Sequence, residues 1–563
     1  MDKRFFIALL LTALVVAITP VLFPGPKPTG LPAGTRRTPA PVTVSSASSG
    51  SSAAPATAVA TNAPAAAVSP SVLPAAGPDA IPGAAAETTT VGTSHARYAF
   101  SSLGAVPVAA RMLDYRSLSR GERHAQPVEL TRAGEPLLRY RIVVGADTLV
   151  LDRVQFALAT VDSLSTPKVL RYEAAVGTGR VAITYAVVPD SYTVRVRGEV
   201  SGLGDRAFAL IDLPPGLRSE EADTLEDQRH LAYAYKPQSA DAKSISFAKL
   251  EPGEQRLESR PLTWVVAKSK YFLVGLLTDS GDTPFAELAV VGGARTSKVA
   301  SHARATVVES LANGAFAFTV YAGPQEWRRL HALGRDFENA NPYGGFLQGV
   351  VQPFATIVMR VLLWMHERLS LSYGWVLVIF GVAVRILLWP LNQKAMRSSL
   401  QMQRLQPQLQ EIQKRHQNDP QKLQAEMMRV YKEHNMSPFS TFAGCLPMLI
   451  PMPVLFALFF VFQNTIEFRG VPFLWLPDIS VHDPYYILPV VVGISAFVLS
   501  WIGMRNTPPN PQTKMMGYIF PPMMTFLFLK FASGLNLYYA VQNLATLPQQ
   551  WLLSRERARA AKT

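Results

Sequence analysis

The sequence has little charge and almost no cysteine. Only 17% of its 563 residues are charged and 48% are hydrophobic, whereas typical soluble domains are about 25% charged. A chain of this composition cannot cover itself with polar surface unless lipid solvates part of it. The single cysteine, Cys445, excludes a disulfide, a cysteine-based zinc site and an iron–sulfur cluster within one chain.

Sequence motifs for catalysis are also missing. The chain contains no G-x-S-x-G, P-loop, G-x-G-x-x-G or H-E-x-x-H pattern, and His366-Glu367 lacks the second histidine of a zinc site. We therefore predict that the protein is not an enzyme and uses neither metal nor cofactor. Acids distant in sequence leave open a carbohydrate-active site in the strand-rich part described below.

The first 97 residues contain one apolar run and then a stretch without large side chains. Lys3 and Arg4 precede the apolar run 5–23, which is long enough to span about 30 Å of hydrocarbon and ends without an A-x-A pattern. We predict a transmembrane anchor over 1–23, with a cleaved signal peptide as the alternative. Residues 24–97 contain no aromatic residue, and this Ala-, Pro- and Ser-rich composition predicts a disordered linker.

Between residues 98 and 335 the apolar residues alternate with polar ones. The alternation is clearest in the segments 138–144, 181–187 and 192–196. Asn313-Gly314 before another alternating run predicts a hairpin turn that feeds a strand. Many short strands without helical spacing predict an extracytoplasmic antiparallel β-sandwich.

The C-terminal part carries apolar runs of membrane length. Residues 336–373 predict an amphipathic helix in the membrane interface, whose apolar face would hold Phe354, Val358, Val361, Leu362, Met365 and Leu369. A core of five spans, 374–552, and a basic tail, 553–563, follow. The spans are 374–391, 445–466, 486–503, 516–531 and 535–552. With the anchor, the fold class is a polytopic α-helical membrane protein of six spans.

Basic and acidic connections alternate along this core. Segment 392–444 carries eight Lys or Arg against four acids, whereas 467–485 carries one against three. The positive-inside rule then predicts that both termini and 392–444 are cytoplasmic and that the sandwich is outside. The net charge of +14 follows from this topology and requires no sequence-specific nucleic-acid binding.

Segment 392–444 predicts a cytoplasmic helical hairpin. Leu405, Leu409 and Ile412 form one apolar stripe, 423–434 carries another, and Asn418-Asp419-Pro420 predicts the turn. The stripes could pack against each other or dock a partner, and both remain open. Candidate ribosome or partner contacts are the basic residues of the hairpin and tail: Lys414, Arg415, Lys422, Arg429, Lys432, Arg555, Arg557, Arg559 and Lys562.

One charge lies inside an apolar span. Arg385 is close to the middle of 374–391, where an arginine costs about 2.5–3.5 kcal/mol, and no other span of the core offers a carboxylate to pair with it. Its guanidinium could reach the cytoplasmic surface or face a wet groove. Polar residues that could line such a groove, or could instead form helix–helix hydrogen bonds, are Gln463, Asn464, Ser495, Ser500, Thr525, Gln542, Asn543 and Thr546.

Several motifs in combination resemble the YidC membrane protein insertases. They are Val384-Arg385 with Trp389-Pro390-Leu391, Gly444-Cys-Leu-Pro447, Asp483-Pro-Tyr-Tyr-Ile-Leu-Pro489, Ser533-Gly-Leu-Asn-Leu-Tyr-Tyr539 and Gln549-Gln550. The resemblance covers the anchor, the β domain and 340–552. It implies the long form, with a periplasmic sandwich similar to sugar-mutarotase folds.

The resemblance also implies roles for single residues. Arg385 matches the groove arginine, Gly381 sits where the family often has a polar residue, and Tyr538 and Tyr539 match substrate-contacting tyrosines. The chain departs from the family pattern in three places, the last of which would interrupt the final span: Pro451, Ala532 and Pro548.

The function implied by the resemblance is insertion of newly made proteins into the bacterial inner membrane. Their hydrophobic segments would pass through a polar, lipid-open groove with a central arginine, without a cofactor. The implied partners are nascent membrane proteins, the ribosome and the lipid bilayer, with the Sec translocation channel as a further candidate. The alternatives are a secondary transporter, which would show repeat symmetry, and a membrane-anchored glycan-binding or glycan-modifying β-sandwich protein.

Overall fold

A computed structural model describes eleven stretches of the chain. They are 86–162, 166–177, 179–202, 207–279, 283–295, 302–311, 313–341, 348–416, 419–433, 452–504 and 511–560. The predicted anchor 1–23 and residues 24–85 of the predicted linker lie outside these stretches, as does Pro451.

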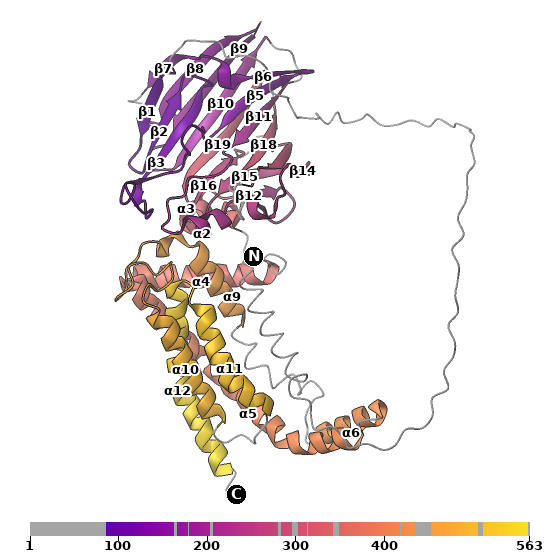
Figure 1. The fold of residues 1–563 in the computed structure, drawn as a ribbon. Coiled ribbons are helices and arrows are strands. Elements are labelled where there is room, and N and C mark those ends of the chain that lie inside the picture. Colours follow the sequence, from indigo (N-terminus) through magenta and orange to yellow (C-terminus); the bar gives the residue numbers. More distant parts are fainter. Residues whose placement is uncertain are drawn as a thin grey trace, which may run out of the picture. The chain divides into compact units, whose positions relative to one another are not determined.

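The strands form a sandwich of antiparallel sheets (Figure 1). The largest sheet has nine strands in the order β13-β12-β15-β16-β19-β10-β9-β8-β7. Its strands are β7 (Ala157–Asp162), β8 (Lys168–Val176), β9 (Gly179–Val187), β10 (Thr193–Ser201), β12 (Ala232–Pro237), β13 (Lys243–Ser246), β15 (Leu262–Lys268), β16 (Phe272–Leu277) and β19 (Ala315–Pro324).

Two smaller sheets complete the sandwich. The six-stranded sheet, in the order β14-β17-β18-β11-β5-β6, contains β5 (Arg139–Val144), β6 (Asp147–Val150), β11 (Ala207–Leu213), β14 (Gln255–Glu258), β17 (Glu287–Gly292) and β18 (Ala303–Ser310). The four-stranded sheet is a meander of β1 (Thr88–Gly92), β2 (Ala96–Ser101), β3 (Val106–Arg116) and β4 (Pro127–Glu129). Short helices join the strands: η1 (Leu151–Arg153), α2 (Thr224–Arg229), η2 (Phe247–Lys249), α3 (Trp327–Ala332) and η3 (Phe337–Ala340).

The alternation in the sequence corresponds to the inner faces of these sheets. Tyr140 and Ile142 of β5 are buried, as are Ile183 and Tyr185 of β9, and all four belong to one apolar core with residues of the four-stranded sheet. The predicted sandwich is therefore confirmed. Its first strand begins at Thr88, before the predicted boundary at residue 98, because a run of threonines forms a strand without the apolar alternation that the prediction relied on.

The predicted hairpin at Asn313-Gly314 is wrong in one respect. Both residues have left-handed φ values, 53° and 74°, as a tight turn requires. However, β18 before the turn lies in the six-stranded sheet and β19 after it lies in the nine-stranded sheet. The turn connects two layers, and its conformation alone could not indicate which strands pair.

The C-terminal part consists of long helices. They are α4 (Gln348–Leu369), α5 (Tyr373–Arg415), α6 (Pro420–Glu433), α9 (Met452–Asn464), α10 (Ile487–Met504), α11 (Pro511–Phe528) and α12 (Ser533–Ala560), with the short η5 (Ile466–Phe468) after α9. In the described residues, two segments are long and apolar enough to cross a membrane, Tyr373–Pro390 and Ile487–Met504, and a shorter apolar helix covers Gly517–Phe528.

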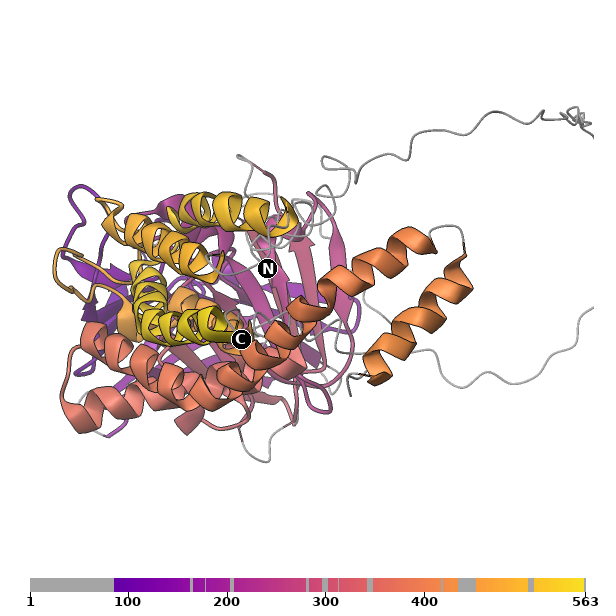
Figure 2. The same cartoon turned by 90° about the horizontal axis from the view of Figure 1, so that it is seen from below.

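Helix α5 joins two elements that the sequence analysis had separated. Its 43 residues extend about 65 Å at 1.5 Å per residue, so the apolar segment and the first arm of the hairpin are one continuous helix. Figure 2 shows α6 beside the end of α5. The two apolar stripes meet there, with Leu405 and Leu409 packed against Val430 and Tyr431.

Helix α4 does not present its apolar residues to a single environment. Val358, Leu362 and Met365 are buried in the helical core, whereas Phe354 and Trp364 are exposed. Val361 and Leu369 of the predicted apolar face are exposed as well. The helix therefore has two apolar sides, of which one is buried in the helical core and the other is exposed.

The connection after α9 contacts the sandwich directly. The Nε atom of Arg469 lies 2.8 Å from Oε1 of Glu221, and its other nitrogens donate to the backbone oxygens of Arg116 at 2.9 Å and Glu220 at 3.3 Å. Ile466 is buried within the core of the sandwich. The buried, paired Arg469 and the inserted side chain of Ile466 thus join the helical part to the sandwich.

Candidate functional site

Helices α5 and α12 approach each other closely at Gly381. A Cβ atom at this position would lie 3.0 Å from Cγ1 of Val541, so the absence of a side chain permits the approach. The backbone oxygen of Gly381 accepts a hydrogen bond of 2.7 Å from Nε2 of Gln542. Gly381 thus contributes its backbone oxygen to the contact between α5 and α12.

Arg385 lies one helical turn beyond Gly381 on the same side of α5. The half-buried guanidinium donates a hydrogen bond to Oε1 of Gln549 on α12. Among the described residues, Arg385 forms no ion pair, and its Nε atom and the Nε2 atom of Gln549 are buried without hydrogen-bond partners. Because the amide is neutral, this contact orients the guanidinium without cancelling its charge.

The two tyrosines of α12 face different neighbours. Tyr538 is buried, and its ring lies 6.1 Å from that of Phe380 on α5. The ring of Tyr539 lies 4.7 Å from Phe528 at the end of α11. Tyr538 therefore shares the α5–α12 contact with Arg385, whereas Tyr539 lies on the α11 side.

Other predicted groove residues form hydrogen bonds within or between helices. Asn543 donates to Oγ of Ser495 at 3.0 Å and to the backbone oxygen of Val492 at 3.3 Å, which links α12 to α10. Thr525 and Thr546 each donate to a carbonyl of their own helix, at 3.0 and 2.6 Å. The bonds of these residues are those of helix packing.

The remaining predicted groove residues do not join this group. Ser500 is half-buried on α10. Gln463 and Asn464 end α9, and their side chains lie outside what the structure describes. Helix α12 continues past Pro548 to Ala560, so the predicted interruption is wrong; the ring is exposed and only the backbone donor is lost.

Gln549 is the site residue that the sequence analysis did not assign. It lies seven residues after Gln542, and two helical turns bring both amides to the face of α12 that meets α5. Two features of the sequence could have identified Gln549. It lies seven residues from Gln542, and Arg385 in another span has no carboxylate with which to pair. The sequence alone does not determine which face of α12 turns toward α5.

The predicted ribosome or partner contacts of the hairpin are exposed. Arg415 pairs with Glu411, Lys422 with Asp419, and Arg429 with Glu426 and Glu433. Lys414 and Lys432 are exposed on the same two helices. Such exposed pairs contribute little to stability, about 0–1 kcal/mol each, so these side chains remain free to rearrange toward a partner.

The basic tail begins on α12. The guanidinium of Arg555 lies over the ring of Trp551, 3.5 Å from its centroid. The side chains of Arg557 and Arg559, and all of Lys562, lie outside what the structure describes. In the described part of the chain, no cluster of three or more His, Cys, Asp or Glu could hold a metal ion.

Comparisons with known proteins cover most of the chain. A family model described as "60Kd inner membrane protein" matches residues 364–560, and the "YidC periplasmic domain" model matches 88–357. The chain is 30% identical to the membrane protein insertase YidC of Anaeromyxobacter dehalogenans (strain 2CP-1 / ATCC BAA-258) over 444 residues, 77% of each protein. It is 37% identical to that of Anaeromyxobacter sp. (strain Fw109-5) over 240 residues, 43% of each.

A solved structure is also similar. The crystal structure of an active YidC insertase with its first transmembrane domain resolved is 19% identical, and the match covers 82% of this chain and 92% of that one. The TM-score is 0.32.

Proposed function

The chain belongs to the YidC family of membrane protein insertases, and from that premise we propose that it moves hydrophobic segments of newly made proteins into the membrane past Arg385. The family is one of bacterial inner-membrane proteins. The observation that carries the proposal is a half-buried guanidinium on α5 whose partner on α12 is the neutral amide of Gln549. Nothing in the described residues favours a transporter or a glycan-modifying protein.

In this mechanism the arginine acts through its uncompensated charge. A positive charge in a partly dry site attracts an acidic segment more strongly than it would in bulk water. The short hydrophilic tail of a substrate would be held beside Arg385 and Gln549 while its apolar segment moved into lipid. Transfer of that segment supplies the driving force, about 0.8 kcal/mol per buried CH₂, so the mechanism requires neither nucleotide nor metal.

The groove around the arginine is proposed to include the other polar side chains named from the sequence. Gln542 and Tyr538 support it by their position at the α5–α12 contact. Ser495, Asn543, Thr525 and Thr546 already have hydrogen-bond partners, so they would contribute polarity only if a substrate replaced those bonds.

We further propose six spans, with both termini and the α5–α6 hairpin in the cytoplasm and the sandwich in the periplasm. The alternation of basic and acidic connections supports this orientation. The basic residues of the hairpin and tail would then face the ribosome, whose RNA is anionic, and the bilayer surface; the Sec translocation channel is a further candidate partner.

The test of the groove uses two substrates that differ only in an acidic or a neutral tail. Cells carry Arg385→Lys or Arg385→Ala as the only copy, and insertion of each substrate is measured. Lysine should largely replace arginine, whereas alanine should reduce insertion of the acidic-tailed substrate about tenfold and of the neutral one less.

Two results would contradict this mechanism in different ways. Full insertion of both substrates by the alanine variant, at normal protein level, would mean that the charge has no role. Equal failure of lysine and alanine would assign the role to the planar fork of guanidinium donors, which a lysine cannot reproduce.

A further inference from the structure

The connection between α9 and α10 carries a tight turn built from apolar residues. Residues 470–477 have no charged side chain, and the only side-chain hydrogen-bonding group is the indole N–H of Trp475. The N–H of Phe473 donates to the oxygen of Leu476, and the N–H of Leu476 donates to the oxygen of Phe473, both at 2.9 Å. Phe473 and Leu476 are buried. The two residues at the tip are not, since Leu474 is 69% exposed and Trp475 is 37% exposed.

Leucine is an unfavourable residue for this tip. Leu474 has a left-handed φ of 52°, a conformation that glycine or asparagine adopts at a lower cost. Among the described residues, one other large apolar or aromatic side chain has a left-handed φ, Tyr486 at 58°. Tyr486 lies in the same connection and is also exposed. Side chains that are held at a conformational cost, without packing inside the protein, indicate a contact outside it.

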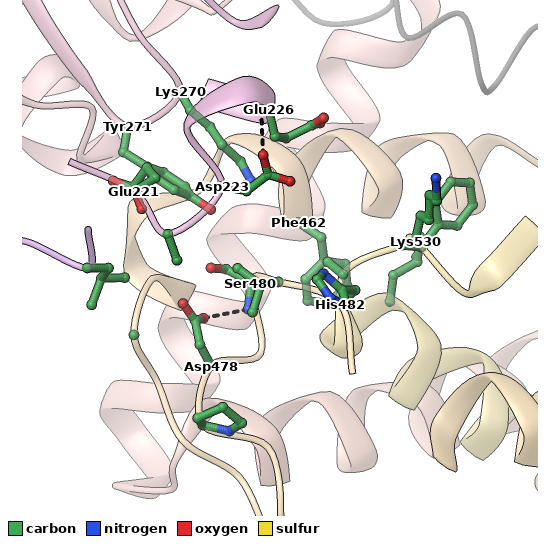
Figure 3. A pocket seen from close by; sticks show the side chains of 18 of the residues that line it. Glu221, Asp223, Glu226, Lys270, Tyr271, Phe462, Asp478, Ser480, His482 and Lys530 are labelled. Carbon is green, nitrogen blue, oxygen red and sulfur yellow. Dashed lines mark hydrogen bonds between the residues drawn. The ribbon is translucent and has the colours of Figure 1, made fainter. Parts of the chain in front are cut away.

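The connection is held in place on both sides of the turn. Before the turn, Arg469 pairs with the sandwich. After it, the N–H of Ser480 donates to Oδ1 of Asp478 at 2.8 Å, at the edge of a pocket that both residues line (Figure 3). The N–H of Ser533, at the start of α12, donates to the backbone oxygen of Val481 at 2.6 Å. The tip therefore projects from a fixed base.

The first turn of α5 packs directly on this base. The ring of Phe473 lies 5.5 Å from that of Trp375, the third residue of α5, in an edge-to-face contact. A Cβ atom on Gly374 would lie 2.0 Å from the ring of Phe473, so the missing side chain permits the contact. The turn thus lies beside the start of the apolar segment Tyr373–Pro390.

The first turn of α10 is linked to the tip through Asp483. The indole N–H of Trp475 donates to Oδ2 of this buried carboxylate at 3.4 Å, and the N–H of Leu488 donates to the same oxygen at 2.8 Å. The apolar segment Ile487–Met504 begins at this point. Two segments of membrane length therefore start at the level of the turn, where an inner-membrane protein meets the layer of lipid headgroups.

We propose that this turn inserts Leu474 and Trp475 into the leaflet of the bilayer on the side of the sandwich. Leu474 would reach the acyl chains, and the indole would lie among the headgroups, where tryptophan is enriched. The turn has few N–H groups to remove from water, because those of Phe473 and Leu476 are paired and Pro472 has none.

A lipid surface fits the position of the tip better than a protein does. A second copy or a partner would also cover apolar side chains, but neither requires the tip to lie level with the starts of α5 and α10. The inserted turn would hold the connection, and through Arg469 the sandwich, at a fixed height above the membrane. This insertion requires that α5 and α10 cross the membrane, as proposed, but it is independent of the mechanism at Arg385.

The test measures the depth of position 474 in lipid vesicles. Full-length protein with Cys445→Ala carries one nitroxide label, at Leu474→Cys, Ile487→Cys or Leu257→Cys, in vesicles of phosphatidylethanolamine and phosphatidylglycerol. Ile487 is the first residue of α10, and Leu257, an exposed leucine of β14, is the matched control. We expect the ratio of collisions with oxygen to collisions with a polar nickel chelate to be about fivefold higher at 474 than at 257, since only oxygen enters lipid.

The label at 487 separates failure of the turn from failure of the proposed spans. Equal ratios at 474 and 257, with a high ratio at 487, would place the turn in water and overturn its insertion. A low ratio at 487 as well would mean that α10 does not begin in the bilayer, and the spans would fail with the turn. Exclusion of both reagents from 474 would mean that protein covers the tip, and dipolar broadening between labels would identify a second copy; either result overturns the lipid assignment.

Discussion

A guanidinium held by a neutral amide keeps its charge available. Arg385 and Gln549 satisfy only part of each other's hydrogen-bonding capacity, because Nε of the arginine and Nε2 of the glutamine are buried without partners in the described residues. A carboxylate at position 549 would orient the guanidinium equally well and would cancel its charge. The neutrality of the partner is therefore the property to test.

We predict that Gln549→Glu impairs insertion selectively. Acidic-tailed substrates should insert about tenfold less well, because an internal ion pair replaces the attraction to the tail, while neutral-tailed substrates should be little affected. Insertion of the matched pair in cells with the variant as the only copy measures this. Gln550→Glu adds the same charge one residue away and is the control; equal effects of the two variants would contradict the model.

Glu467 lies at the junction between the helices and the sandwich, and its burial lowers the free energy of unfolding by an amount that depends on pH. Both carboxylate oxygens are buried and lack hydrogen-bond partners of good geometry in the described part of the chain. Burial raises the pKa of this carboxyl from 4.5 to about 7, against a smaller lowering by nearby backbone N–H groups. The folded protein thus holds a proton that the unfolded chain releases, so the free energy of unfolding falls as the pH rises from about 4.5 to 7.

We predict that Glu467→Gln stabilises the protein at pH 8 by up to about 3 kcal/mol, because each pKa unit corresponds to about 1.36 kcal/mol. The gain should shrink as the pH falls toward 5. Thermal unfolding of the full-length protein in detergent between pH 5 and 8 measures it, with Glu122→Gln, at an exposed side chain, as the control. A gain that does not vary with pH would show that the pKa of Glu467 is not raised in the folded protein.

Arg385 could be identified from the sequence, but its partner could not. An arginine within an apolar span is conspicuous because it is costly there. The partner depends on the rotation of α12 about its axis. Gln542, Asn543 and Thr546 are among the predicted groove residues, whereas Gln549 is not. The structure directs the two glutamines toward α5 and Asn543 toward α10.

At the scale of elements, apolar patterns predicted the elements but not all of their partners. Period-two alternation located the strands, and the stripes of the hairpin predicted surfaces that do meet, at Leu409 and Val430. Sheet membership was not predictable at Asn313-Gly314, where the same turn chemistry serves a hairpin or a crossover between layers. Asp483, the first residue of the motif 483–489, has a local structural role. Its carboxylate accepts hydrogen bonds from the N–H groups of Tyr485 and Leu488 at the start of α10.

The C-terminal end of α12 allows a test of the ribosome contact. Removal of residues 554–563 takes away Arg555, Arg557, Arg559 and Lys562, and phosphate contacts are lost as salt increases. We predict weaker co-sedimentation with ribosomes and a shallower salt dependence between about 50 and 200 mM. A full-length variant with the four basic residues replaced by glutamine should behave like the truncation; unchanged binding by both would leave the tail as a topology signal alone.

For the whole molecule, the contacts at Arg469 restrict how the chain can be placed across a membrane. Arg469 pairs with Glu221 and also bonds to the backbone of the sandwich, and Ile466 is buried in the core of the sandwich. The 467–485 connection and the sandwich must therefore be on the same side. The ring of Tyr373, at the start of α5, lies 5.1 Å from that of Phe468, so α5 also begins on this side.

From there the apolar segment Tyr373–Pro390 would carry α5 across, so that its far end and α6 lie on the opposite side. We predict that a reporter fused after Lys422 scores as cytoplasmic and that one fused after Arg469 scores as periplasmic. The charge asymmetry of the connections gives the direction, and the Arg469 contacts give the pairing of the connection with the sandwich independently of charge.

A third fusion, after Gly253 in a turn of the sandwich, separates the two arguments. If it agrees with the Arg469 fusion but both are cytoplasmic, the orientation is inverted and only the charge argument fails. If the Gly253 fusion and the Arg469 fusion lie on different sides, the contact between Arg469 and Glu221 does not form in the membrane.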